Sequence, residues 1–247
     1  RSRGLGDVYK RQGKVNVLGM QHDLVFGVDD EYRKIYREDL IRQKSLTTFS
    51  YLNPVYGREV MGTTVSAPDS AQTDKLRSDS LFLQDSIHLN EQWILVAGGR
   101  FQEYDQYAGK GVPFKANTDS NGQKWVPRAG LVYRYTDALS FYGSYTESFK
   151  PNSTIAPLSG SSTVLDGSIA PEEAKSWELG ARLDMPGSIT GNIALFDIKK
   201  RNVLVANSEG PTTIYSAAGE VRSRGLEVDL SGQLSEHWNL IGSYAYT

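Results

Sequence analysis

Hydrophobic and polar residues alternate along segments of about ten residues, the pattern of β-strands whose two faces meet different surroundings. The clearest case runs from Trp125 to Tyr135, where the odd positions are mainly apolar and the even positions include Arg128 and Arg134. Four more segments of this kind lie at 139–146, 177–184, 225–231 and 238–247. Less regular alternation adds candidates at 24–35, 77–89, 93–105 and 189–205. The pattern therefore predicts an all-β protein of about nine strands.

The connections between these segments alternate between two lengths. Short turns lie near 90–92, 136–138, 185–188 and 235–237. Long connections lie near 37–75, 106–124, 150–174 and 206–219. A transmembrane β-barrel places tight turns on the periplasmic side and long loops outside, whereas a soluble sandwich has no reason to sort them. About ten residues also suffice for a tilted strand to cross the hydrocarbon layer. We therefore expect an antiparallel transmembrane β-barrel with long extracellular loops.

The four tryptophans fit the same interpretation. Trp93 and Trp238 follow short turns, whereas Trp125 and Trp177 follow long connections. Each is thus expected at a membrane interface, two on each side, where an amphipathic ring is most favourable. The alternative for the same residues is packing in the core of a soluble β-domain that has one wet face.

Composition excludes several other classes of protein. The longest apolar run is Trp93 to Ala97, far short of the roughly 20 apolar residues that a membrane-crossing helix requires. The net charge is −2 and no block of five like charges occurs, so nucleic acid is not expected as a partner. Cysteine is absent, which removes zinc ribbons, thiol catalysis, iron–sulfur clusters and disulfides.

The two ends of the chain give expectations about the extent of the domain. Residues 1–12, RSRGLGDVYKRQ, lack the apolar stretch of a signal peptide and resemble a translated sequencing-adapter remnant. We therefore expect 1–12 to be a non-native leader outside the fold and 13–247 to be the native domain. Nine strands would close only a narrow barrel, whereas the polar faces carry Arg, Glu, Asp and Gln, which suit a wide hydrated interior. Because the last strand runs to Thr247, we expect a fragment of a larger barrel.

Several stretches resemble one family in their order and spacing. They are NPVYG (53–57), LQDSIHL and LVAGGRF (83–101), SYTESFKPN (144–152), APEEAKSWELGAR (170–182), ALFDIKKRNVLV (194–205), and GEVRSRGLEVDLSGQL with GSYAYT (219–247). Together they are similar to the TonB-dependent ferric-siderophore receptors of the bacterial outer membrane, nearest to the ferrichrome-receptor type. The resemblance covers nearly everything from about residue 14 onward.

The resemblance implies a barrel of about 22 strands that encloses an N-terminal plug and imports a ferric siderophore. It also implies energy from the inner-membrane proton gradient, delivered by TonB, ExbB and ExbD through the plug. The outer face would contact membrane lipid and lipopolysaccharide. The sequence departs from the family pattern in having no plug, no TonB box and no closing C-terminal strand with a terminal aromatic. By itself it should neither close a barrel nor couple to TonB, so the implied function belongs to a parent receptor.

A ferric siderophore carries its iron already wrapped in hard oxygen ligands, so we expect no metal cluster and no cofactor in the protein itself. His22, His88 and His237 show no ligand spacing and are expected on the surface or in the lumen. Such a site needs aromatic surface and hydrogen-bond donors at the outer mouth of the barrel.

The candidate ligand-binding residues lie on long connections or near the outer ends of strands. Five of them could supply rings to the siderophore: Tyr51, Tyr56, Tyr104, Tyr107 and Phe149. Arg128, expected to point inward near the outer end of its strand, could supply a cation. The alternatives are packing within loops or in the aromatic girdle for the rings, and an interior ion pair with Glu178 or another carboxylate for Arg128.

Other motif residues have structural interpretations. Four glycines would permit close approach to the plug or relieve crowding within strands: Gly98, Gly99, Gly180 and Gly225. The run Lys199-Lys200-Arg201 is expected to face solvent or lipid headgroups, with binding of lipopolysaccharide phosphates as its alternative.

Other functions stay open. Within the same architecture the alternatives are a receptor for cobalamin or heme and a passive porin with a charged constriction. An enzyme is not expected, because Asp105, Asp119 and Asp166 lie on or beside loops without an accompanying histidine. A soluble structural β-domain is the remaining alternative, and partition into detergent would distinguish it.

Overall fold

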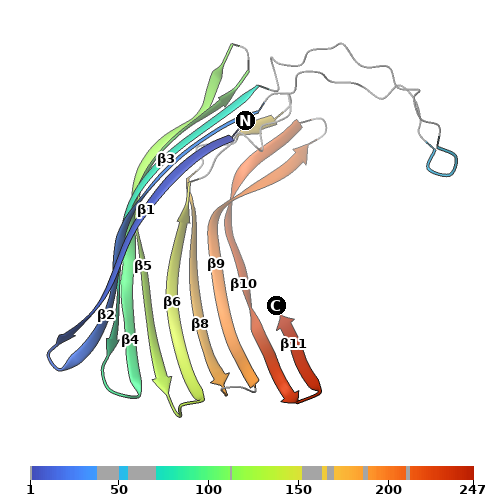
Figure 1. The fold of residues 1–247 in the computed structure, drawn as a ribbon. Helices are drawn as coiled ribbons and strands as arrows, with labels where there is room; N and C mark the ends of the chain where they lie inside the picture. Colours follow the sequence, from blue (N-terminus) through green and yellow to red (C-terminus); the bar gives the residue numbers. More distant parts are fainter. Residues whose placement is uncertain are drawn as a thin grey trace.

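A computed structural model gives the structure of the chain and describes residues 2–37, 50–54, 71–111, 113–151, 163–165, 170–185, 189–209 and 212–247. These residues form one large sheet (Figure 1). Its strands are β1 Ser2–Val17, β2 Met20–Arg37, β3 Gln72–His88, β4 Trp93–Lys110, β5 Lys115–Arg134, β6 Leu139–Lys150, β7 Thr163–Leu165, β8 Glu172–Asp184, β9 Ile189–Glu209, β10 Thr212–Ser235 and β11 Trp238–Tyr246. Within these ranges, no helix combines the length and the hydropathy that a membrane span needs.

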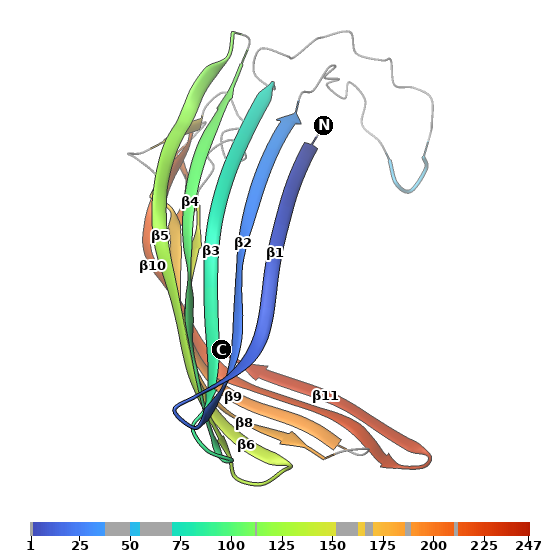
Figure 2. The same cartoon turned by 60° about the vertical axis from the view of Figure 1, so that its left-hand side comes forward.

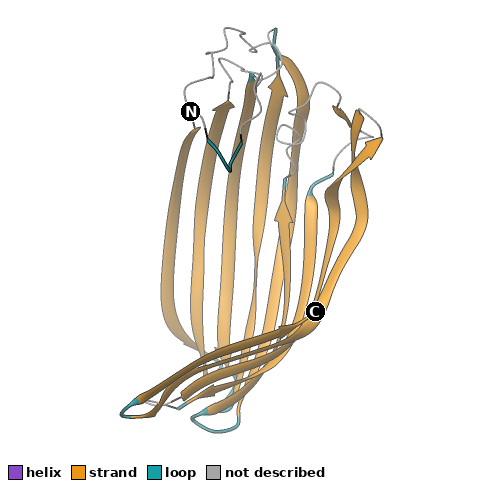
Figure 3. Ribbon diagram, turned by 90° about the vertical axis from the view of Figure 1, so that its right-hand side faces the viewer, coloured by secondary structure: helices purple, strands orange, loops and turns teal. Residues whose placement is uncertain are grey.

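Each strand of the main path pairs antiparallel with the next, in the order β1-β2-β3-β4-β5-β6-β8-β9-β10-β11. The short β7 lies off this path and pairs in parallel with residues 213–215 of β10. Figures 2 and 3 show that the sheet is a curved wall, with the lower parts of β8–β11 swinging away from β1–β4. The predicted antiparallel all-β fold is confirmed, and β1 and β7 are present in addition to the nine expected strands.

Many strands are longer than the alternation suggested. β5 has 20 residues, β9 has 21 and β10 has 24. The expected long loops at 106–124 and 206–219 are therefore wrong, because pairing continues to Lys110↔Lys115 and to Thr212↔Glu209. Beyond an apolar band both faces of a strand meet water, so polar residues occupy odd and even positions alike and the alternation disappears while the ladder continues. The other two long connections lie partly outside the described residues.

The N-terminal segment also differs from expectation. Residues 2–12, expected outside the fold, form most of β1 and pair in register with β2 from Ser2↔Ile35 onward. The cause is the two-residue turn at Leu18 (φ 53°) and Gly19 (φ 80°), whose positive φ angles match the twist of a hairpin and fix its register. Residues 2–12 thus belong to the sheet in this structure, and the non-native origin of 1–12 stays a prediction.

The turns that join β1 to β2, β3 to β4, β5 to β6 and β10 to β11 lie at one end of the sheet, the lower end in Figure 1. Asn90 Oδ1 accepts hydrogen bonds from the backbone N–H of Gln92 (2.9 Å) and of Trp93 (2.8 Å). Thr136 Oγ1 accepts from the backbone N–H of Leu139 at 2.9 Å. These side chains stabilise tight turns by replacing backbone partners. The connections that follow β2, β4, β6 and β9 leave from the opposite end, as predicted.

The two faces of the sheet differ as the alternation predicted. The outer face carries large exposed apolar side chains, among them Phe26, Leu81, Leu83, Trp125, Phe141, Leu179 and Leu195. An apolar face of this extent matches a surface that contacts lipid hydrocarbon. On the opposite, lumen face, Arg100 of β4 donates to both carboxylate oxygens of Asp29 of β2 at 2.7 Å. This pair reaches across β3 on the lumen face.

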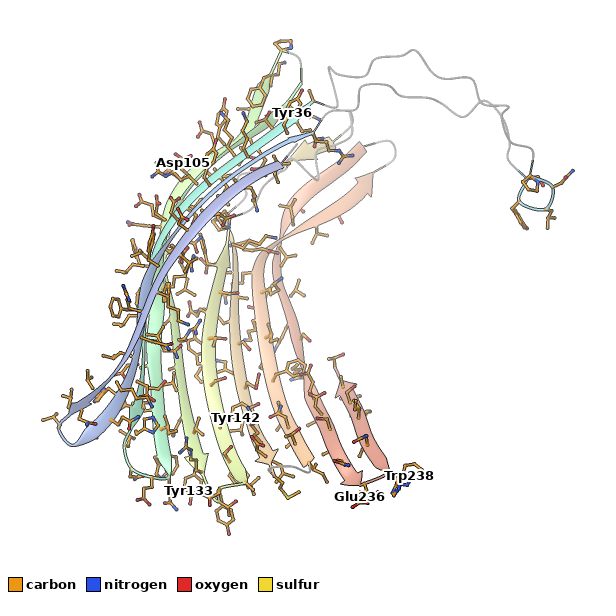
Figure 4. All side chains as sticks on the ribbon, in the orientation of Figure 1. Tyr36, Asp105, Tyr133, Tyr142, Glu236 and Trp238 are labelled. Carbon is orange, nitrogen blue, oxygen red and sulfur yellow. The ribbon has the colours of Figure 1, made fainter. Side chains whose placement is uncertain are left out.

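An aromatic level bounds the outer face at the end with the short turns. The rings of Trp93 and Tyr133 lie 4.5 Å apart between centroids, and Trp238 is exposed beside its turn. Figure 4 shows Tyr133 and Trp238 at this end, with Tyr36 and Asp105 near the opposite end.

A second aromatic level lies farther along the strands. The rings of Tyr145 and Trp177 lie 4.5 Å apart, and Trp125 is the ladder partner of Phe101. Residue 101 is eight positions beyond Trp93 on β4, which spans about 26 Å at ~3.3 Å per residue. For strands tilted by about 40° this path corresponds to a height of about 20 Å, somewhat less than the ~25 Å apolar band of an outer-membrane barrel.

Glycines make room for aromatic rings from neighbouring strands. A Cβ on Gly99 would lie 2.3 Å from the Trp125 ring, and one on Gly225 would lie 3.0 Å from the Phe196 ring. A Cβ on Gly98 would lie 2.4 Å from the backbone oxygen of Leu83. Crowding between strands therefore accounts for these glycines, and Gly180 follows the same rule.

Substitution of Gly180 with alanine is expected to destabilise the barrel by about 1–3 kcal/mol, because its Cβ would overpack a filled position. That Cβ would lie 2.6 Å from the Tyr142 ring and 2.7 Å from the backbone oxygen of Ile193. The midpoint of urea unfolding in the complete protein measures the effect. The matched control is Gly143→Ala, whose nearest atom is 3.7 Å away on Leu179, and an equal loss in the control would contradict the prediction.

Candidate ligand-binding site

A seam opens in the wall between β5 and β6. Their ladder begins at Arg134↔Ser140 and ends at Arg128↔Thr146, although both strands continue. Pro127 lies directly beyond the last pair, and proline has no N–H with which to continue a ladder. Figure 1 shows β5 rising past the end of β6 together with its partner β4. Among the described residues, the seam is therefore joined by side chains and not by backbone hydrogen bonds.

Two side-chain contacts bridge the seam. The Tyr104 ring of β4 lies 5.4 Å from the Phe149 ring of β6, between centroids. The Lys124 Nζ of β5 donates to Glu173 Oε1 of β8 at 2.7 Å, and each of these side chains is about one-third exposed. Gly122 gives the Tyr104 ring its space, because a Cβ there would lie 3.0 Å from Tyr104 Cε1. The seam thus joins an aromatic surface to an ion pair.

Beside and below the seam, the lumen face is lined by hydrogen-bonded polar groups. The Tyr142 hydroxyl donates to Glu178 Oε1 at 2.5 Å. Arg128 Nη1 donates to Gln84 Oε1 at 2.9 Å, and Gln102 Nε2 donates to Ser78 Oγ at 2.9 Å. A wall of this kind presents donors and acceptors to a hydrated interior. By alternation along β6 and β8, Phe149 and Glu173 lie on the face that carries Tyr145 and Trp177, whereas Tyr104 and Lys124 lie on the lumen face of the hairpin. The seam contacts therefore join the lumen face of the hairpin to the outer face of β6–β8, and their rings and cation suit an amphipathic ligand.

The structure brings together two of the five ring candidates, Tyr104 and Phe149. Tyr104 is only 6% exposed, so Phe149 is the more accessible ring of the pair. Tyr107 lies toward the end of the β4–β5 hairpin, where its ring packs 5.8 Å from that of Phe114 and Lys75 lies over it at 5.9 Å. For Tyr107, local aromatic packing is therefore the interpretation that the structure supports.

The other three candidates are not gathered at the seam by the described structure. Tyr51 is exposed in the short described segment 50–54, and Tyr56 lies outside the described residues. Arg128 was expected near the outer end of its strand, but β5 continues from it to Lys115, so Arg128 lies at mid-height. Its partner is Gln84, while Glu178 accepts from Tyr142 instead.

The sequence prediction missed Lys124 and Glu173. They are 49 positions apart, and neither stands in an apolar alternation that would set its facing. One usable signal was present: Pro127 inside a strand pattern marks an edge, so a break in the sheet beside it could have been expected.

The described residues hold no group of three or more His, Cys, Asp or Glu side chains that could bind a metal. Two histidines have single carboxylate partners on β2 and β3: His22 Nδ1 lies 2.7 Å from Asp85 Oδ2, and His88 Nε2 lies 3.0 Å from Asp23 Oδ2. His237 lies in the turn before β11.

Two described proteins are similar to this chain in sequence. The metal-pseudopaline receptor CntO of Pseudomonas aeruginosa is 30% identical over 244 residues, which cover 95% of this chain and 33% of that protein. The ferrichrome outer membrane transporter/phage receptor of Escherichia coli is 32% identical over 183 residues, covering 70% of this chain and 22% of that protein. The chain thus spans a third or less of the length of these two relatives.

A comparison with solved structures and a family model point to the same class of protein. The ferric-catecholate import receptor Fiu of Escherichia coli, in its closed form, superposes with a TM-score of 0.78 at 17% identity, covering 99% of this chain and 37% of that one. The family model described as TonB dependent receptor-like, beta-barrel, matches residues 2–247. The chain therefore belongs to the TonB-dependent receptor β-barrel family of the bacterial outer membrane.

Proposed function

We propose that the chain is part of a receptor that binds a ferric siderophore at the outer mouth of its barrel and imports it across the outer membrane. The observation that most supports this is the break between β5 and β6, where the Tyr104–Phe149 ring pair and the Lys124 ammonium lie toward the end of the sheet opposite the hairpin turn at Asn90. An amphipathic chelate needs rings for its apolar parts and donors for its oxygens.

The names of the relatives narrow the class of ligand without selecting one member. They describe receptors for metal-pseudopaline, for ferrichrome and for a ferric catecholate. In each case the chelator supplies the metal ligands, so in this proposal the protein needs no cofactor and performs no catalysis. A ferrichrome-type specificity is one of these three options.

The proposed partners follow from the same function. A plug domain in the complete receptor would connect the barrel to TonB, ExbB and ExbD, which deliver energy from the inner membrane. The apolar outer face, bounded by its two aromatic levels, would contact outer-membrane lipid and lipopolysaccharide.

Iron uptake by cells that produce the complete receptor tests the proposal. Iron-starved cells that make no siderophore receive radioactive iron as ferrichrome, as a ferric catecholate or as metal-pseudopaline, with and without a protonophore. We expect uptake of at least one chelate and its loss when the inner membrane is de-energised. Uptake that persists with the protonophore would favour a passive porin, and uptake of cobalamin or heme alone would overturn the siderophore assignment.

A further inference from the structure

The upper part of the wall consists of two pieces that no described ladder joins. Residues 115–127 of β5 pair with β4 but not with β6. Residues 147–150 of β6 pair with β8 but not with β5. Elsewhere on the main path the ladders between consecutive strands extend over all or nearly all of the shorter strand, as for β6 and β8 from Leu139↔Leu183 to Lys150↔Glu172. The β4–β5 hairpin above Pro127 can therefore tilt relative to β6–β8 without breaking a backbone hydrogen bond between them.

On its other side the hairpin is held by β3, whose ladder with β4 runs to Gln72↔Lys110. Its distance from β6–β8 is therefore the part of its position that side chains set. The Lys124–Glu173 pair joins its stem to β8 at 2.7 Å. The neighbouring charges of β6 and β8 have other partners: Glu147 lies 3.2 Å from Lys175, and Glu172 lies 3.7 Å from Lys150 and 3.9 Å from Lys200. Among these neighbours, Glu173 is thus the carboxylate that meets the hairpin's ammonium group.

The aromatic pair depends on the same approach. Tyr104 belongs to the hairpin, because it is the ladder partner of Gly122 on β5, whereas Phe149 belongs to β6. Tilting the hairpin away from β6 would separate the two rings along with Lys124 and Glu173. The ion pair and the ring contact therefore form and break together.

We propose that Lys124 and Glu173 are positioning residues, whose ion pair holds the β4–β5 hairpin against β6–β8 and so keeps Tyr104 in contact with Phe149. The consequence for ligand affinity rests on the proposed function, in which this ring pair contacts the siderophore. The positioning itself does not depend on a ligand. An ion pair of this exposure adds little to the stability of a continuous sheet. Across the seam, where no backbone ladder joins β5 to β6, the ion pair instead sets the distance between the hairpin and β6–β8.

Charge reversal in the complete receptor tests the proposal. Lys124→Glu and Glu173→Lys each place like charges across the seam, while the double variant restores opposite charges. A nitroxide label at Gln123→Cys, an exposed position on the hairpin, reports its motion. Residues 1–247 contain no cysteine to compete for the label, and any cysteine elsewhere in the complete receptor is first replaced with serine. We expect a more mobile label and a roughly three- to tenfold weaker siderophore affinity in each single variant. The double variant should recover both values.

A second ion pair on the same chain provides the matched control. Arg222 donates to Asp197 across β10 and β9, where the ladder runs without interruption from Val221↔Lys200 to Gly232↔Ile189. The side chains of this pair are 44% and 32% exposed, similar to those of Lys124 and Glu173. Asp197→Asn should change neither the mobility of the label nor the affinity.

The outcomes separate this inference from the function on which it draws. A label that is equally immobile in the wild type and both single variants would overturn it, as would a double variant that recovers neither value. If label mobility follows the charges but the wild-type receptor binds no siderophore, the proposed function fails and the positioning role stands. A heat-modifiability gel on each variant shows that the barrel is folded before any label is read.

Discussion

Replacing Phe149 with alanine is expected to weaken siderophore binding by roughly tenfold. The substitution removes the accessible ring of the pair that bridges the seam and leaves Tyr104 without its aromatic partner. Aromatic contacts contribute about 0.5–1.5 kcal/mol beyond the burial of area, and ~1.4 kcal/mol corresponds to a factor of ten in affinity. Titration of the complete receptor with the ferric chelate, followed by quenching of its intrinsic fluorescence, measures the change.

The hairpin tip supplies the control for this experiment. Phe114→Ala also removes one ring of an aromatic pair, because Phe114 packs 5.8 Å from Tyr107. Its position near the turn between β4 and β5 is remote from the seam, so the affinity should stay within about twofold of wild type. Equal losses in the two variants would show that general softening of the hairpin, and not contact with the chelate, explains the effect.

Replacing Arg100 with methionine is expected to destabilise the barrel by about 3 kcal/mol. Arg100 makes two 2.7 Å hydrogen bonds to Asp29, whose side chain is only 13% exposed. Removing one member of a half-buried charge pair leaves the other charge without compensation, which costs more than the pair itself contributes. Urea unfolding of the complete protein in lipid vesicles measures this loss, and a second substitution, Asp29→Asn, should recover most of it.

An exposed arginine–aspartate pair provides the control for the loss of stability in the Arg100 variant. Arg77 lies 3.4 Å from Asp79, with side chains 67% and 52% exposed. Because water solvates both groups when the pair is broken, Arg77→Met should change stability by no more than ~0.5 kcal/mol. Comparable losses in both variants would show that burial does not determine the energy of the Arg100 pair.

Strand positions were predictable from sequence wherever the two faces of the sheet contrast. Between residues 125 and 183 one face is apolar and the other polar, and the alternation identified β5, β6 and β8 there with their facing. The upper parts of β4 and β5 were missed because both faces carry polar side chains at that height, as at Asp105↔Asn121. Pairing there follows from the register of the hairpin below, which residue polarity does not encode.

The ligand site was only partly predictable for a related reason. Tyr104 and Phe149 were identified as rings near strand ends, but their contact depends on how two hairpins approach across a break. Lys124 and Glu173 gave no signal of their own, since a lysine and a glutamate 49 positions apart are unremarkable until the topology brings them within 2.7 Å. Only Pro127 marked the place where the regular pairing rule ends.

The extension of β4 beyond Phe101 carries the β4–β5 hairpin past the second aromatic level. Nine further residues lead to Lys110, about 30 Å of hydrogen-bonded ribbon at ~3.3 Å per residue. A hydrogen-bonded hairpin of this length is expected to project from the membrane into the lipopolysaccharide sugars, well above the acyl chains. Antibodies raised against the tip of the hairpin should therefore recognise intact bacteria whose lipopolysaccharide layer is no thicker than the height of the hairpin.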